Sequence, residues 1–152
     1  MCKLNWFMVL VLSLTTAGIV HAEVKNEPEA RTAIMLNKSE RDLVLLEMRI
    51  FLQSVQQIIS GVTEDDMEQI VKAARKSGRA AQQAVPASLA AKLPKGFKTL
   101  GFDTHSKFDE LALHAEQLGD GEHALSQLKE LMVNCVACHE TYSFELEANT
   151  AK

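Results

Sequence analysis

Two cysteines and a histidine near the carboxyl end of the chain are the residues best suited to chemistry. They stand together as Cys135-Val136-Ala137-Cys138-His139. This C-x-x-C-H spacing is that of a c-type haem attachment site. In such a site the two thiols add to the two vinyl groups of the porphyrin, and the adjacent imidazole binds the iron. The motif therefore predicts one covalent haem c, held by Cys135 and Cys138, with His139 as its iron ligand.

Three other uses of this cysteine pair fit the sequence less well. A thioredoxin-like dithiol lies near a helix N-terminus in a βαβ unit, and no strand pattern surrounds this motif. A zinc site needs further ligands, and no second Cys or His pair has the spacing. A disulfide between residues i and i+3 of a helix would be strained. Haem attachment remains the strongest interpretation.

The amino end of the chain has the pattern of an export signal. Lys3 is followed by an apolar run from Trp6 to Leu14, and Val20-His21-Ala22 is a small-x-small cleavage site. The run is too short to span a bilayer as a helix. We therefore expect residues 1–22 to be a signal peptide and residues 23–152 to form one exported, periplasmic domain, with no membrane span in the mature protein.

The composition excludes several classes of protein. The 47% of hydrophobic residues is too high for intrinsic disorder. Sixteen Lys and Arg against twenty Asp and Glu, without a basic run, argue against nucleic acid as a partner. Three Pro and seven Gly are few for a β sandwich or barrel. The sequence also has no recognisable carboxylate pair or nucleophile–base pair, so we expect no enzyme.

Hydrophobic periodicity predicts an all-α fold, an antiparallel up-down-up-down four-helix bundle. The first helix is expected to begin at Asn37 or Ser39 and to end at Gly61. The second is expected to open with a capping box over residues 63–66 and to stop at Pro86. A short helical turn at 88–93 lies in the long connection from 86 to 102, the next helix spans 103–118, and the last runs to about residue 146. The inward seams are Arg41, Leu45, Met48, Leu52, Val55 and Ile59 on the first helix, and Leu125, Leu128, Met132, Cys135, His139, Tyr142 and Leu146 on the last.

In such a bundle the start of the first helix lies at the same end as the finish of the last. His139 is then about seven residues from the end of its helix, and the same depth on the first helix is Leu45, within a window from Arg41 to Met48. On the second helix this depth falls on Ser77 and Gly78. Their small side chains would leave room for a flat macrocycle, or simply let helices approach closely.

The late C-x-x-C-H motif and the helical pattern resemble the cytochromes c′, a family of exported bacterial haem proteins. The resemblance covers about residues 38–146. It implies a four-helix bundle with His139 as proximal ligand, Arg41 near a haem propionate, Leu45 as an apolar distal residue and Tyr142 as the aromatic after the motif. The family usually has an Arg next, but here the residue is Ser143, so one cation near His139 is missing.

Two functions follow from this resemblance. A five-coordinate iron under an apolar lid would bind small gases such as NO and CO, or exchange single electrons. The alternative is a six-coordinate, low-spin electron-transfer cytochrome with Met48 as sixth ligand and a redox protein as partner. No Met or His follows the motif, so any sixth ligand must come from upstream.

The other histidines and one further apolar stripe have smaller roles. His105 could contact a propionate or the iron, whereas His114 and His123 are expected to be solvated. Val44, Phe51 and Ile58 form an apolar stripe beside the first seam. This stripe predicts a homodimer surface, unless the second helix covers it.

Overall fold

The computed structural model describes residues 29–148, so the predicted signal peptide at residues 1–22 lies outside the described residues. Within that range the chain is mostly helical, in agreement with the all-α prediction. The elements are β1 (Thr32–Leu36), α1 (Lys38–Glu64), α2 (Met67–Lys76), a 3₁₀ helix η1 (Arg79–Ala84), α3 (Ala87–Lys92), α4 (Lys95–Leu118), α5 (Gly121–Thr141) and β2 (Tyr142–Leu146).

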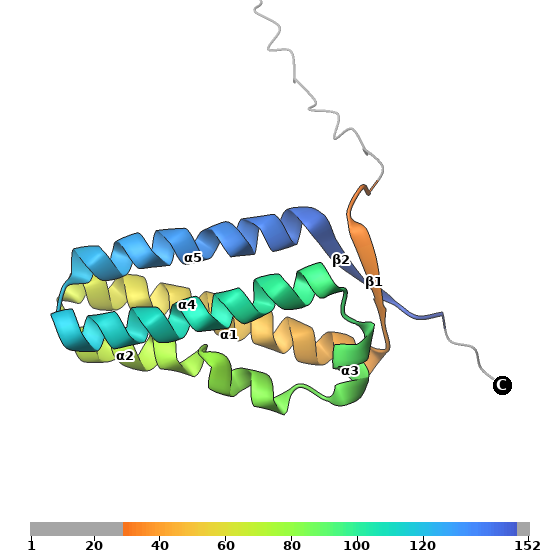
Figure 1. The fold of residues 1–152 in the computed structure, drawn as a ribbon, viewed down its shortest axis with the longest axis horizontal. Coiled ribbons are helices and arrows are strands. Elements are labelled where there is room, and N and C mark those ends of the chain that lie inside the picture. The colour runs from red at the N-terminus through yellow and green to blue at the C-terminus, as the bar shows by residue number, and fades with distance from the viewer. Residues whose placement is uncertain (1–28, 149–152) are drawn as a thin grey trace, which may run out of the picture.

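The longer helices pack in sequence around a common interior (Figure 1). Helix α1 packs on α2, α2 on α4, and α4 on α5. Contact between α5 and α1 is much sparser. The two strands lie at the end of the molecule where α5 finishes and α1 begins, which is the relation of ends that the sequence predicted.

The strands were not expected, and they correct the predicted end of the last helix. β1 and β2 pair in parallel, with Thr32 opposite Tyr142 and Leu36 opposite Leu146. Helix α5 therefore ends at Thr141 and does not reach residue 146. The extended form gives the last residues partners: Tyr142 and Phe144 both pack edge-on against Phe97.

Helix α1 begins where the sequence predicted but ends later. The Asn37 side chain accepts a hydrogen bond from the Glu40 N–H at 3.0 Å, and the Glu40 carboxylate accepts one from the Asn37 N–H at 3.0 Å. Gly61 does not end the helix. It is buried inside it, where a Cβ would lie 2.7 Å from Cγ1 of Ile70. The chain turns at Asp65, which has φ 55°.

The second helix is shorter than predicted and the next one longer. The cap of α2 is Asp66, which accepts from the Gln69 N–H at 2.9 Å, so the capping box predicted over residues 63–66 is not formed as such. The α-helix stops at Lys76 and becomes 3₁₀ from Arg79. The predicted short turn is α3, and α4 starts at Lys95, two turns before Asp103. Gly119, with φ 61°, ends α4 as expected.

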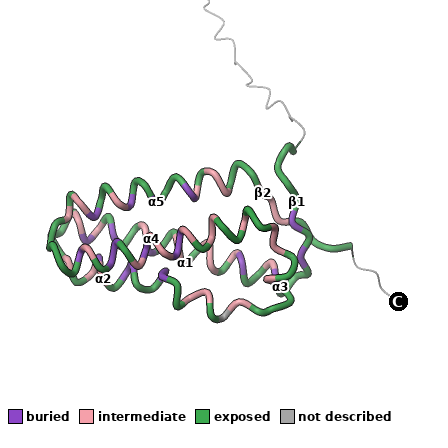
Figure 2. The backbone as a smooth tube through the Cα atoms, viewed as in Figure 1, coloured by how far each residue is buried: buried purple, intermediate pink, exposed green. Residues whose placement is uncertain are grey.

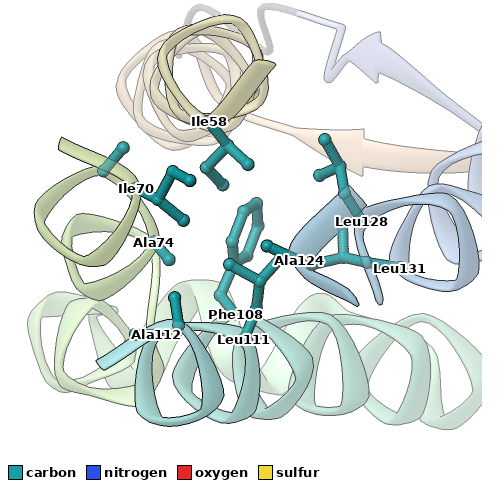
Figure 3. Packing of buried hydrophobic residues seen from close by; sticks show 11 residues of the cluster. Ile58, Ile70, Ala74, Phe108, Leu111, Ala112, Ala124, Leu128 and Leu131 are labelled. Carbon is teal, nitrogen blue, oxygen red and sulfur yellow. The ribbon is translucent and has the colours of Figure 1, made fainter. Parts of the chain in front are cut away.

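Figure 2 marks the buried residues along the chain; the apolar ones among them form two clusters, the larger of which is drawn in Figure 3. The larger, which we call the main core, lies between α1, α2, α4 and α5. Its buried members are Ile58, Ile70, Ala73, Ala74, Phe108, Leu111, Ala112, Ala115, Ala124, Leu128 and Leu131. The smaller, the strand-end core, contains Ile34, Leu36, Val44 and Leu89, with Phe97, Tyr142 and Phe144 packed against it.

The core face of α1 differs from the predicted seam. Val44 and Ile58 are buried and Phe51 packs on the main core, whereas Leu52 is 70% exposed and Ile59 43%. The stripe offered as a dimer surface is therefore covered within the chain. The helix carries two adjacent apolar stripes, and buried Ser54, bonded to Ser77 of the next helix at 2.8 Å, belongs to the inner one. Helix α1 is also long and apolar enough, by length and composition alone, to cross a membrane.

Candidate functional site

The C-x-x-C-H motif occupies the last two turns of α5, beside the strand pair. Cys135 and Cys138 are half-buried free thiols, and Cys135 packs against the main core. His139 is exposed, two residues before the end of the helix. The three side chains of the motif thus lie on one short stretch of helix, with Cys135 against the core, Cys138 half-buried and His139 exposed.

The backbone of this last turn is held by three donors. The Tyr142 N–H caps the helix on the Cys138 carbonyl. The Thr141 hydroxyl donates to the Ala137 carbonyl at 2.6 Å, and the Arg31 guanidinium donates to the His139 carbonyl at 3.3 Å. Arg31 is itself paired with Glu29, and that hydrogen bond lowers the pKa of Glu29 to about 2. The helix end that carries His139 is therefore anchored to the segment before β1.

The environment of the thiols disfavours a dithiol redox centre. Burial raises the pKa of the Cys135 thiol, and burial together with the neighbouring Cys135 raises that of Cys138. Reactive dithiols have the opposite shift, which a helix N-terminus supports. Here the cysteines lie at the C-terminal end, where the helix dipole disfavours a thiolate.

Only two residues of α5 follow His139, instead of the predicted seven. The position of His139 along the bundle axis therefore follows from the contacts of α5 with α1. Gly121 lies against α1, where an added Cβ would be 3.7 Å from Cγ1 of Val62. Seventeen residues on from Gly121 is Cys138, and seventeen back from Val62 is Leu45. Since both helices rise about 1.5 Å per residue, Leu45 lies level with Cys138, and Met48 lies level with Cys135.

Arg41, Leu45 and Met48 recur on one side of α1 and are all half-buried. Nε of Arg41 is buried and has no hydrogen-bond partner among residues 29–148. A buried guanidinium N–H without an acceptor costs about 1–3 kcal/mol. This side of α1 therefore presents an unsatisfied cation donor next to two apolar side chains.

The space expected at Ser77 and Gly78 is present only in part. Ser77 lines a hollow of about 200 Å³. Its hydroxyl bonds that of Ser54, and its carbonyl lies 2.7 Å from Nδ1 of His105. At Gly78 a Cβ would collide with the Asp109 carboxylate, so there the small residue lets the elements approach closely.

Tyr142 is the first residue of β2, three residues after His139. Its ring lies 5.5 Å from that of Phe97, and a Cβ at Gly96 would lie 2.5 Å from its hydroxyl oxygen. The hydroxyl of Ser143, where the family usually has Arg, is buried without a hydrogen-bond partner in the described part of the chain. The aromatic residue thus joins α5 to the start of α4.

Two hollows of about 200 and 600 Å³ lie in the half of the molecule that carries the motif. Glu47, Val85 and His105 line both of them, while Cys135, Cys138 and His139 line neither. His105 is 3% exposed, and its Nε2 lies 3.3 Å from Oε1 of Glu47. Burial lowers the pKa of His105, but the hydrogen bonds to Glu47 and to backbone carbonyls outweigh it and raise this pKa above its ordinary value.

His105 was among the candidates predicted from the sequence, but its partner Glu47 was not. Glu47 lies between Val44 and Phe51 on the core face of α1, and an acidic residue on an apolar face predicts a buried partner. That signal was available in the sequence. Within residues 29–148 no group of three or more His, Cys, Asp or Glu is arranged to hold a metal ion.

Comparison with protein-family models, with curated proteins and with solved structures finds no match to this chain.

Proposed function

We propose that the chain is an exported, periplasmic c-type haem protein built as a four-helix bundle of the cytochrome c′ kind. Cys135 and Cys138 would hold one haem by thioether bonds, and His139 would be the proximal ligand of its iron. The observation that carries the proposal is the C-x-x-C-H motif at the end of α5, with half-buried thiols and an accessible imidazole.

The residues across from the motif fit this group. A propionate carboxylate would supply the acceptor that Nε of Arg41 lacks, and charge-assisted hydrogen bonds of this kind are strong. Large apolar side chains are exposed on both α1 and α5, whose mutual contact is sparse: Leu52 and Ile59 on the first, and Leu125, Met132 and Val136 on the second. A porphyrin near this side of the bundle would cover part of that surface.

The haem supplies a redox-active iron that binds small gases and carries single electrons. The chain's own part is to fix its ligand and to restrict access. Anchoring of the last turn by Arg31, Thr141 and Tyr142 holds the backbone that presents His139. Leu45, level with Cys138, would be the apolar lid on the opposite face, with no hydrogen-bond donor for anions or O₂. We therefore favour a five-coordinate iron that binds NO or CO.

The alternative is a six-coordinate electron-transfer cytochrome with Met48 on the iron. Met48 is half-buried on the same side of α1 as Leu45, which keeps this function open. Met48 lies level with Cys135, about 4.5 Å deeper in the bundle than Leu45. This is about one helical turn away from the level of His139. The register thus supports Leu45 over Met48.

Covalent attachment is tested by mass spectrometry of the acid–acetone-treated, denatured protein expressed with a c-type haem maturation system. The expected mass is that of residues 23–152 plus one haem. Cys135→Ala and Cys138→Ala should each leave one thioether or a degraded product. The mass of the bare polypeptide in the wild type would refute the proposal.

The two functions are separated by absorption spectra of the reduced protein with and without CO. We expect a high-spin ferrous spectrum, CO binding, and faster CO binding in Leu45→Ala. Met48→Ala should leave the spin state unchanged, as should Leu46→Ala, a matched control at an exposed position of the same helix. A low-spin spectrum that persists in Leu45→Ala and disappears in Met48→Ala would instead establish the alternative.

A further inference from the structure

His114 and His123 face each other across the groove between α4 and α5, far along both helices from the C-x-x-C-H motif. Their ring centroids are 5.5 Å apart and the ring planes are inclined at 55°. Both are half-buried, whereas the sequence predicted two solvated side chains. The helical pairing of α4 with α5 brings them together, although they are nine positions apart in the chain.

Two polar atoms at this pair are buried without a hydrogen-bond partner among residues 29–148. They are Nε2 of His123 and Oε1 of Gln127. The other end of the same amide, Nε2 of Gln127, lies 2.7 Å from Nδ1 of His114. Each unsatisfied buried atom costs about 1–3 kcal/mol, so a site that leaves two of them, one turn apart on α5, is incomplete by itself.

One rotation of the Gln127 amide changes the chemistry of the pair. Turned by 180°, the amide presents Oε1 to His114, and Nδ1–H of the imidazole donates to it. The proton of neutral His114 is then on Nδ1, and its Nε2 carries a free lone pair. Together with Nε2 of His123, two imidazole lone pairs then become available on rings whose centroids are 5.5 Å apart.

We infer that His114 and His123 form a binding site for a divalent transition-metal ion, with Gln127 as the residue that positions His114. A metal bound to imidazole lies about 2.0–2.1 Å from the nitrogen and roughly 3.2 Å from the ring centre, so two rings on one ion have centroids up to about 6 Å apart. The observed 5.5 Å fits this limit. Imidazole ligands favour Cu²⁺, Ni²⁺ and Zn²⁺, with Cu²⁺ bound most tightly.

Water would fill the remaining coordination positions, since both histidines are only half-buried. Gln127 also lines a hollow of about 160 Å³ between α4 and α5, which neither histidine lines. The turn that carries His123 is fixed, because the Asp120 side chain accepts from the His123 N–H at 3.0 Å. The site is independent of the haem proposal, since none of its residues belongs to the motif or to the side of α1 that faces it.

The test is titration of the full mature protein with Zn²⁺ by calorimetry, with any free thiol alkylated beforehand so that Cys135 and Cys138 cannot compete. We expect one ion per chain in the wild type and a loss of at least about tenfold in affinity in His114→Gln and in His123→Gln. Gln117→Ala, an exposed neighbour on α4, is the matched control and should bind as the wild type.

Two further measurements identify the role of each residue. Copper EPR of the wild type should show hyperfine coupling to two nitrogen nuclei, and each His→Gln variant should lose one. Gln127→Glu should keep or strengthen binding, while Gln127→Leu should weaken it about 10–100-fold, as expected for a residue that orients a metal-bound imidazole. Unchanged binding in both histidine variants, or none in the wild type at millimolar Zn²⁺, would overturn the inference.

Discussion

The two halves of the helical body are built differently. The half that holds the turns after α1 and α4 contains the main core, whose buried members are all apolar and pack around Phe108 (Figure 3). The half that holds the motif and the strands contains the strand-end core, two hollows and most of the buried polar groups, including His105, Ser77 and Asn134. Asn134 donates to Asp103 and lies within hydrogen-bond distance of Thr104.

Ion pairs and hydrogen bonds hold the elements of the motif half together, because its cluster of buried apolar residues is small. Lys92 of α3 joins Glu40 of α1 at 2.6 Å and Glu147 after β2 at 2.7 Å. The β1–β2 pair and Arg31 connect the same elements. The two halves thus differ in what holds them: apolar packing in one, and ion pairs and strand pairing in the other.

The largest expected effect lies in the main core. Phe108→Ala should lower the free energy of unfolding by about 3–5 kcal/mol, because it removes a fully buried ring and leaves a cavity. Leu52→Ala, on the exposed side of α1, should change it by less than about 0.5 kcal/mol. Urea denaturation followed by circular dichroism measures both. Equal effects of the two substitutions would show that the main core does not carry the stability assigned to it.

The same contrast explains which parts of the fold the sequence predicts. Apolar periodicity and capping residues identified the long helices. As expected, α1 begins after Asn37 and α4 ends at Gly119. The inner stripe of α1 was misassigned because two apolar stripes lie side by side. Which stripe faces inward depends on tertiary contacts such as that of Ser54 with Ser77. The local spacing of apolar residues carries no information about such contacts.

The strand pair and the polar site residues lie beyond local patterns for a similar reason. Residues 142–146 continue a helical spacing, and only their partner β1, more than a hundred residues earlier, makes them a strand. The motif itself was recognisable because its chemistry is local. The His114–His123 pair could not be found in this way, because its geometry arises from the packing of α4 on α5.

The next effect concerns the boundary between the halves, where the hydroxyls of Ser54 and Ser77 bond each other at 2.8 Å with both residues fully buried. Ser54→Ala or Ser77→Ala alone should cost about 1–3 kcal/mol, because each leaves one buried hydroxyl without its partner. The double substitution should cost clearly less than the sum. A double-mutant cycle by urea denaturation measures this coupling, and strictly additive losses would contradict it.

The smallest effect is a pH dependence that belongs to the motif half. Because the pKa of His105 is raised in the folded protein, its protonated form stabilises the fold. That contribution is fully present below the ordinary pKa of histidine and is lost as the pH rises through the raised value. The free energy of unfolding of the wild type should therefore fall over this interval, with a slope against pH that corresponds to less than one proton per molecule.

Glu47→Gln tests the cause of that dependence, since Glu47 lies 3.3 Å from Nε2 of His105. Without the carboxylate, burial should dominate and the slope of stability against pH should flatten or change sign. Glu140→Gln, at an exposed position near the motif, is the matched control and should retain the wild-type slope. Urea denaturation at several pH values from about 5 to 9 gives both slopes. If Glu47→Gln kept the wild-type slope, the ion pair of Glu47 with His105 would not be the source of the pH dependence. The hydrogen bonds of His105 to backbone carbonyls would then account for it.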